Sequence, residues 1–194
     1  PQSPPHPGDT GRSGADGRAR HAPDRDHVKG VVVLAKHCKP GEVGEGPWAE
    51  NWCPVDREVL GGSPRRRRAD SLMLAEGRRF GPAEVRLIWP PPGFSWDQKP
   101  GGDNWVNDSG LVFQIRWGSS AFLITGDISQ KSEKQLVELY GRDLASTVLV
   151  APHHGSRTSL SPEFLEAVGA DYIVFSAGRN NYAGLPHPET VERA

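Results

Sequence analysis

The feature that most constrains the fold is a regular alternation of short apolar runs and amphipathic segments from about residue 84 to residue 176. The runs are rich in β-branched and aromatic residues and are bounded by Gly, Pro or Ser, which is typical of strands. We expect strands at residues 85–89, 111–117, 121–125, 147–151 and 171–176. The short connection at residues 118–120 predicts a hairpin between the second and the third.

Two helices are expected between these strands. Ser129 is a candidate N-cap for a helix over residues 129–140, in which Leu136, Val137 and Tyr140 share one face. A second helix is expected to begin where Ser161 precedes a proline, because proline is favoured at the first helical position. Strands that alternate with helices predict an α/β fold built in layers.

The first part of the chain differs in composition. Residues 1–25 are rich in Pro, Gly, Arg and Asp and contain almost no large apolar side chain, so we expect a disordered or poorly packed tail. The folded domain is then expected over residues 26–194, with 84–188 as its best-defined part. The net charge of −1 argues against a strongly basic nucleic-acid binder. No signal peptide is expected, and no apolar run approaches the length of a membrane span.

Two features of the middle of the chain leave alternatives open. Cys38 and Cys53 are either bridged or present as two free thiols, and their spacing does not fit a zinc ribbon. Four consecutive arginines at residues 65–68 are expected on a loop, either solvated or in contact with phosphates.

Residues that are typical metal ligands occur in four clusters. Three of these clusters lie directly after, or close to, predicted strands, where ligand sites of layered α/β folds gather. The clusters are Asp24, Asp26 and His27 with His21 nearby; Asp127; His153 and His154; and His187. A mixture of carboxylates and imidazoles suits Zn²⁺ or Mn²⁺. Each cluster taken alone is also compatible with turn chemistry or with an exposed histidine.

Residues 104–193 resemble the metallo-β-lactamase-type domain of the ComEC/Rec2 DNA-uptake family. The matching stretches are residues 107–113 (NDSGLVF), 122–128 (FLITGDI), 148–159 (VLVAPHHGSRTS) and 176–188, from SAGRNN to PHP. The most specific of them is the His-His-Gly-Ser segment that follows a strand. The resemblance implies an αββα sandwich and a metal-dependent hydrolase that cleaves DNA phosphodiesters.

Upstream, residues 24–30 (DRDHVKG) resemble the end of the first metal motif of that superfamily, His-x-His/Asp-x-Asp-His-x-Gly. Ala22 stands at the position of the first histidine, and His21 is one residue out of register. The strands that precede this motif in the family are replaced by the Pro/Gly-rich tail. We therefore expect an incomplete copy of the fold, in which a two-ion site is reduced to one ion.

The resemblance also implies roles for individual residues. Asp26 and Asp127 are the expected catalytic residues, with Asp127 bridging two ions and Asp26 orienting a bound water. The expected ligands of Zn or Mn are Asp24, Asp26, His27, Asp127, His153 and His187, with His154 as the alternative to His153. The expected substrate contacts are Ser156, Arg157, Thr158 and Asn180, although Ser156 is equally suited to cap a helix. Trp89, Phe94, Trp96 and Trp105 are expected in the core rather than stacked on bases.

Three functions remain open at this stage. The first is a nuclease of the ComEC/Rec2 type that acts on single- or double-stranded DNA, at the extracytoplasmic face of a bacterial inner membrane and joined to a membrane channel domain. The second is a stand-alone hydrolase of another ester or lactone. The third is a non-catalytic remnant that has lost its metal.

Overall fold

The computed structural model describes residues 42–45, 65–68, 77–91, 105–108 and 110–194. The predicted tail, both cysteines and the cluster that contains Asp24, Asp26 and His27 lie outside these residues. Two short strands, β1 (Glu42–Glu45) and β2 (Arg65–Arg68), pair in parallel. The expectation of a loop at residues 65–68 is therefore wrong, because the backbone of the arginine run pairs with a strand twenty residues earlier, which a local pattern does not reveal.

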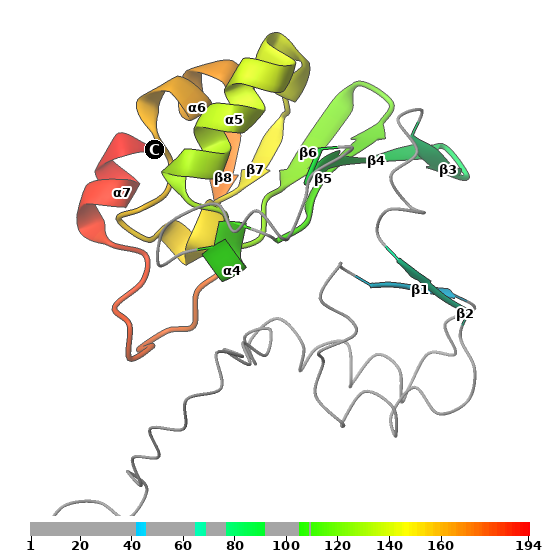
Figure 1. The fold of residues 1–194 in the computed structure, drawn as a ribbon. Helices are drawn as coiled ribbons and strands as arrows, with labels where there is room; N and C mark the ends of the chain where they lie inside the picture. Colours follow the sequence, from blue (N-terminus) through cyan, green and yellow to red (C-terminus); the bar gives the residue numbers. More distant parts are fainter. Residues whose placement is uncertain (1–41, 46–64, 69–76, 92–104, 109) are drawn as a thin grey trace, which may run out of the picture.

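The main sheet has six strands in chain order, as Figure 1 shows. They are β3 (Arg78–Phe80), β4 (Ala83–Trp89), β5 (Val112–Trp117), β6 (Ser120–Ile124), β7 (Val148–Val150) and β8 (Tyr172–Val174). Neighbours from β3 to β6 are antiparallel, and β6, β7 and β8 are parallel. All five predicted strands and the hairpin are confirmed.

The helices follow the predicted pattern. The structure contains α4 (Trp105–Asp108), α5 (Gln130–Tyr140), α6 (Pro162–Val168) and α7 (Pro188–Arg193), with 3-10 turns η2 (Gly141–Leu144) and η3 (Pro152–Gly155). The Oγ of Ser129 accepts a hydrogen bond from the backbone N–H of Lys131 at 3.3 Å, which confirms the predicted N-cap. Among the described residues, no helix has both the length and the apolar composition to cross a bilayer.

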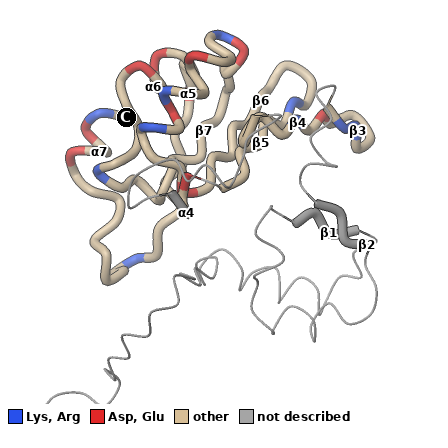
Figure 2. Tube along the Cα trace, in the orientation of Figure 1, with Lys and Arg blue, Asp and Glu red and all other residues tan. Residues whose placement is uncertain are grey.

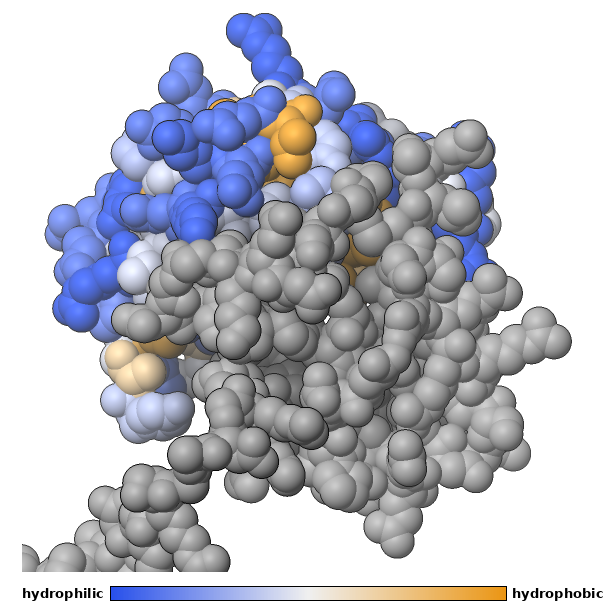
Figure 3. Space-filling model, in the orientation of Figure 1, coloured by the Kyte–Doolittle hydropathy of each residue, from blue (hydrophilic) through white to orange (hydrophobic). Residues whose placement is uncertain are grey.

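One face of the sheet packs against α5 and α6. Leu123 and Leu149 from the central strands join Leu136 of α5 and Phe164 of α6 in a single fully buried core. The outer side of these helices is hydrophilic, apart from a small apolar patch (Figure 3). The helices carry acidic and basic residues, whereas β6 and β7 carry no charged residue (Figure 2). The fold is thus mixed α/β, as predicted.

The other face of the sheet is apolar as well. Residues opposite each other in neighbouring strands share a face, so the register defines two rungs across five strands. They are Val85, Ile115, Phe122, Val148 and Tyr172, and Leu87, Phe113, Ile124, Val150 and Val174. The ends of this face, at Phe80 and Trp117 on one side and Tyr172 and Val174 on the other, are exposed. The sheet therefore offers an apolar surface in both directions.

A buried carboxylate fixes the start of α5. Asp108 accepts hydrogen bonds at Oδ1 from the backbone N–H of Ser129 at 2.8 Å and from the Oγ of Ser132 at 3.0 Å. Its backbone carbonyl accepts a hydrogen bond from Nε1 of Trp89 at 2.7 Å. A negative charge at a helix N-terminus is favourable because it faces the unpaired N–H groups of the first turn. Asp108 thus ties the β4 end to the segment that follows β6.

A second buried carboxylate joins α5 to α6. Both oxygens of Glu133 accept backbone N–H groups at the start of α6, from Leu160 at 2.6 Å and from Ser161 at 2.8 Å. Burial raises the pKa of the Glu133 carboxyl, while these hydrogen bonds and the charge of Arg193 act in the opposite direction. The guanidinium of Arg193 also donates to the carbonyls of Ser159 and Leu160. Glu133 and Arg193 together hold the chain that enters α6.

We expect Glu133→Ala to lower the free energy of unfolding by about 2–3 kcal/mol, because it leaves two buried backbone N–H donors without an acceptor. Glu138→Ala is the matched control, since Glu138 lies on the same helix in an exposed ion pair with Lys134 and should change stability by less than about 0.5 kcal/mol. Urea unfolding measures both. Equal effects of the two variants would contradict the structural role of Glu133.

Candidate functional site

Parallel pairing of β6 and β7 brings two predicted site loops to one edge of the sheet. Asp127 follows β6, and His153 and His154 follow β7, so both loops leave the sheet in the same direction. The loops are bonded to each other, because the backbone N–H of His153 donates to the carbonyl of Gly126 at 3.0 Å. The carboxyl ends of parallel strands thus place an acid and two histidines together, as the sequence predicts.

Asp127 and His154 face each other across this edge. Oδ1 of Asp127 lies 3.6 Å from Nε2 of His154, and the two side chains are only 12% and 20% exposed. Nδ1 of His154 lies 2.6 Å from the carbonyl oxygen of Ser176, which is an acceptor, so this nitrogen carries the proton. In the neutral ring the lone pair of Nε2 is then directed toward the carboxylate side, as in histidines that bind metal ions.

His153 takes a different position. Its ring lies 6.5 Å from that of His154, edge to face, and its Nδ1 is buried without a hydrogen-bond partner among the described residues. The contact with Asp127 is thus made by the alternative ligand, His154. Asp127 and His154 do not form a group of three or more ligand-type side chains with other described residues.

The backbone of the histidine turn is strained. His153, His154 and Gly155 have φ values of 48°, 54° and 83°, in the left-handed region that side chains with a Cβ avoid. At Gly155 a Cβ would lie 2.7 Å from both Cδ1 of Phe175 and Cβ of Pro186. The turn is therefore held between β8 and the segment before α7, and strain of this kind concentrates at functional sites.

His187 lies on the next segment of the same site. It is the N-cap residue of α7, and its backbone N–H donates to the carbonyl of Gly155 at 3.0 Å. Three residues later, Oγ1 of Thr190 donates to the carbonyl of Ser156 at 3.2 Å. The predicted ligand His187 is therefore next to the histidine turn in space, although 32 residues separate it from Gly155 in the sequence.

The predicted substrate contacts divide into two groups. Ser156 is the C-cap residue of η3 and bonds to Thr158 through their hydroxyls at 3.2 Å, beside the site. Arg157 is exposed and forms an ion pair with Glu189 of α7. Asn180 is exposed on the segment between β8 and α7, with a φ of 63°. Their predicted roles toward a substrate remain predictions.

Of the aromatic residues expected in the core, Trp89 is fully buried, so the prediction is confirmed for this residue. Phe94 and Trp96 lie outside the described residues.

Sequence reasoning missed two supports of the site. The first is the Ser176 carbonyl, which has no signal in the sequence. The second is Asp108, which the sequence marks only as part of the stretch at residues 107–113 that carries the resemblance. A Cβ at Gly110, two residues after Asp108, would lie 3.9 Å from the backbone nitrogen of Asp127.

Comparison with curated proteins gives matches among competence proteins. Over 108 residues the chain is 42% identical to the competence protein ComA of Neisseria gonorrhoeae, covering 55% of this chain and 15% of that protein. It is 25% identical over 179 residues to ComE operon protein 3 of Bacillus subtilis, covering 87% and 21%. It is 35% identical over 88 residues to recombination protein 2 of Haemophilus influenzae, covering 45% and 11%.

The chain is therefore similar to competence proteins of the ComEC/Rec2 kind. The ComEC/Rec2 resemblance expected from the motifs is thereby confirmed. The chain spans about a fifth or less of the length of these relatives. No family profile matches it.

We expect Gly155→Ala to destabilise the protein by at least about 1–3 kcal/mol, because the new Cβ collides with Phe175 and Pro186 and because φ is positive. Gly178→Ala is the matched control, since no atom lies within 4 Å of a Cβ there and φ is not positive. Thermal unfolding of the two variants gives the comparison. A Gly155→Ala protein as stable as the control would show that the turn is not confined as described.

Proposed function

We propose that this chain is a metal-dependent hydrolase domain that cleaves DNA phosphodiesters during DNA uptake. The observation that carries the proposal is the Asp127–His154 pair at the carboxyl ends of β6 and β7, in a chain related to competence proteins. A role in DNA uptake rests on that relationship. Hydrolysis rests on the chemistry of the paired side chains.

The donor set fits a Zn or Mn ion. A carboxylate and an imidazole nitrogen, both largely buried and 3.6 Å apart, are costly to bring together without a cation or a proton between them. The Ser176 carbonyl fixes the ring of His154 in the orientation that directs Nε2 to such a cation. His153, His187 and the cluster of Asp24, Asp26 and His27 are the proposed additional ligands, for one or two ions.

A bound Zn or Mn ion would supply a water of lowered pKa and would polarise the phosphoryl oxygen. The residues of this chain have separate tasks around it. Asp127 and His154 would hold the ion at the sheet edge, and the Ser176 carbonyl orients the ring of His154. Asp26 is proposed to hold the attacking water in position. Ser156 and Thr158, beside the histidine turn, are proposed to contact the substrate.

A specific observation supports a second candidate, the non-catalytic remnant. A protonated His154 would form an ordinary ion pair with Asp127 at this separation, with no metal present. Ala22, in place of an expected ligand, would favour this outcome. No such observation supports a hydrolase of another ester or lactone. The test addresses this candidate only by including esters as additional substrates.

We expect the unmutated chain, reconstituted with Zn²⁺ or Mn²⁺, to retain at least one ion and to hydrolyse single-stranded DNA. Asp127→Asn and His154→Ala should lose the ion and the activity, because each removes a donor, whereas Asp171→Asn changes an exposed carboxylate remote in sequence from both and should lose neither. Ala22→His should tighten metal binding. Elemental analysis measures metal per chain, and an oligonucleotide and an ester panel measure hydrolysis.

Zero metal in the reconstituted, unmutated protein would contradict the hydrolase proposal and support the non-catalytic remnant. Metal without cleavage of DNA, but with cleavage of an ester, would identify a hydrolase of another substrate class. Each outcome is distinct, because metal content and substrate choice are measured separately.

The apolar second face of the sheet supports an αββα sandwich. A sheet with apolar side chains in both directions needs a layer on each face, and α5 and α6 supply only one. We propose that a second sheet covers the rungs that contain Phe122 and Ile124. A membrane channel domain joined to this chain and an extracytoplasmic location, both implied by the resemblance, remain proposals.

We expect Phe122→Lys to lower the free energy of unfolding by several kcal/mol, because a second layer would bury the new charge. Leu139→Lys is the control, since Leu139 is 56% exposed on α5 and the change should cost less than about 0.5 kcal/mol. Chemical unfolding compares the two. A Phe122→Lys variant of near-normal stability would mean that this face is open to water.

A further inference from the structure

The segment between β8 and α7 forms a loop that both begins and ends at the histidine turn. We define the Tyr182 loop as residues 177–186. At one end, the Ser176 carbonyl accepts the hydrogen bond from Nδ1 of His154 at 2.6 Å. At the other end, the backbone N–H of His187 donates to the Gly155 carbonyl at 3.0 Å. Both ends of this loop are therefore fixed beside the histidine turn that carries the Asp127–His154 pair.

The Tyr182 loop is ordered by its own asparagine. Nδ2 of Asn181 donates to the carbonyls of Gly178 at 2.8 Å and Leu185 at 2.6 Å, and its Oδ1 accepts the N–H of Leu185 at 2.9 Å. A loop that is bonded internally in this way loses little additional conformational entropy when it binds a ligand. Its shape is thus set in advance of binding.

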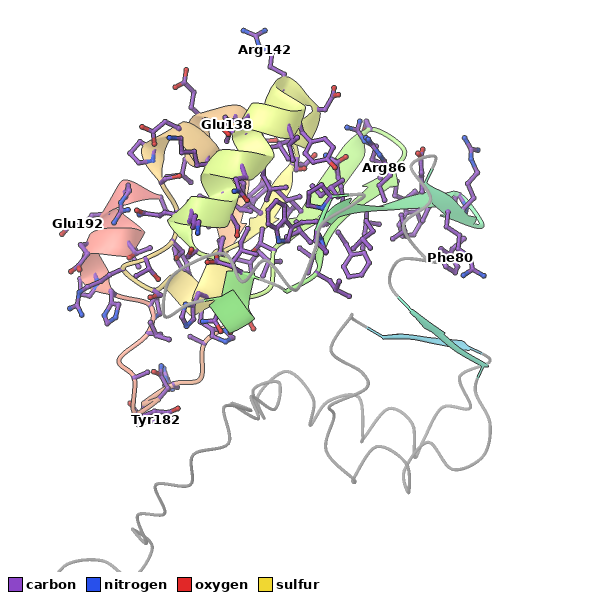
Figure 4. The ribbon with its side chains drawn as sticks, in the orientation of Figure 1. Phe80, Arg86, Glu138, Arg142, Tyr182 and Glu192 are labelled. Carbon is purple, nitrogen blue, oxygen red and sulfur yellow. The ribbon has the colours of Figure 1, made fainter. Side chains whose placement is uncertain are left out.

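The Tyr182 loop carries an exposed aromatic side chain and exposed polar side chains, one of them basic. Figure 4 shows Tyr182 at the tip of the loop, pointing away from the protein, and its side chain is fully exposed. Arg179 and Asn180 are also exposed. A single exposed aromatic ring needs no explanation by itself. Here the ring lies on a preformed loop, three residues after an exposed arginine in the sequence, and the loop is attached at both ends to the site.

We propose that the Tyr182 loop binds single-stranded nucleic acid, with the Tyr182 ring stacked on an unpaired base and the Arg179 guanidinium on a neighbouring phosphate. The inference rests on the proposed function and assigns the substrate class of the same site. An aromatic face and a cation next to each other are the two elements by which proteins bind single strands without reading their sequence.

The length of the loop fits this role. Tyr182 is six positions after Ser176 in the chain, so the tip lies at most about 20 Å from the Ser176 end of the loop along an extended chain. About six stacked nucleotides cover that distance. One strand can therefore contact the loop and the Asp127–His154 pair simultaneously. A paired base does not offer its face to the tyrosine, so duplex DNA gains nothing from Tyr182.

The test measures binding without metal, in EDTA, so that hydrolysis does not enter. The probe is a fluorescent single-stranded oligonucleotide of about 12 nucleotides, with a blunt duplex of the same sequence as comparison. Tyr182→Ala should weaken single-strand binding by about 5- to 140-fold, the range for loss of one base stack, and duplex binding by less than twofold. Tyr182→Phe keeps the ring and should bind normally.

Two further variants separate the elements of the proposal. Leu139→Ala is the control, because Leu139 is an exposed apolar residue on α5, outside both the loop and the apolar sheet face, and the change should leave binding unchanged. Arg179→Gln should reduce the slope of log Kd against log salt by about 0.7, as expected for one lost phosphate contact on a single strand.

The inference is wrong if the unmutated chain does not bind the single strand at low salt, or if Tyr182→Ala binds it normally. It is also wrong if duplex binding falls as much as single-strand binding. None of these results depends on metal content or on cleavage, so failure of the loop proposal is distinguishable from failure of the proposed hydrolase.

Discussion

The parallel pairing of β6 with β7 is the constraint on which the site depends. Because these two strands run in the same direction, the residue after each one reaches the same edge of the sheet. Had β7 continued the antiparallel order of β3 to β6, Asp127 and His154 would emerge at opposite edges. The switch from antiparallel to parallel pairing at β6 therefore decides that an acid and an imidazole meet.

Two buried carboxylates then fix the helix starts that follow the Asp127 loop and the histidine turn. Asp108 holds the start of α5 two residues after Asp127, and Glu133 holds the start of α6 a few residues after His154. Both acids accept backbone N–H groups at helix starts, where negative charge is favoured. The loops of the site are thus placed between rigid points on either side, although neither acid reaches the site itself.

The local sequence pattern is sufficient to predict most of the described strands and helices. The strands at residues 85–89 and 147–151 are dense in β-branched side chains, and Ser129 and Pro162 mark helix starts by chemistry that acts within a few residues. The pairing of residues 65–68 with residues 42–45 depends on a partner twenty residues away, and no local signal predicts it. The choice of His154 over His153 at Asp127 depends on left-handed backbone angles and on the Ser176 carbonyl, which residue types do not encode.

The histidine turn is closed by donors that come from later in the chain. Thr190 and Arg193 of α7 bond to the carbonyls of Ser156, Ser159 and Leu160, and His187 bonds to Gly155. During synthesis the turn leaves the ribosome about thirty residues before these donors, so its carbonyls stay with water until α7 follows. A nascent chain that has already formed β6 and β7 consequently acquires the finished geometry of the turn only when α7 docks.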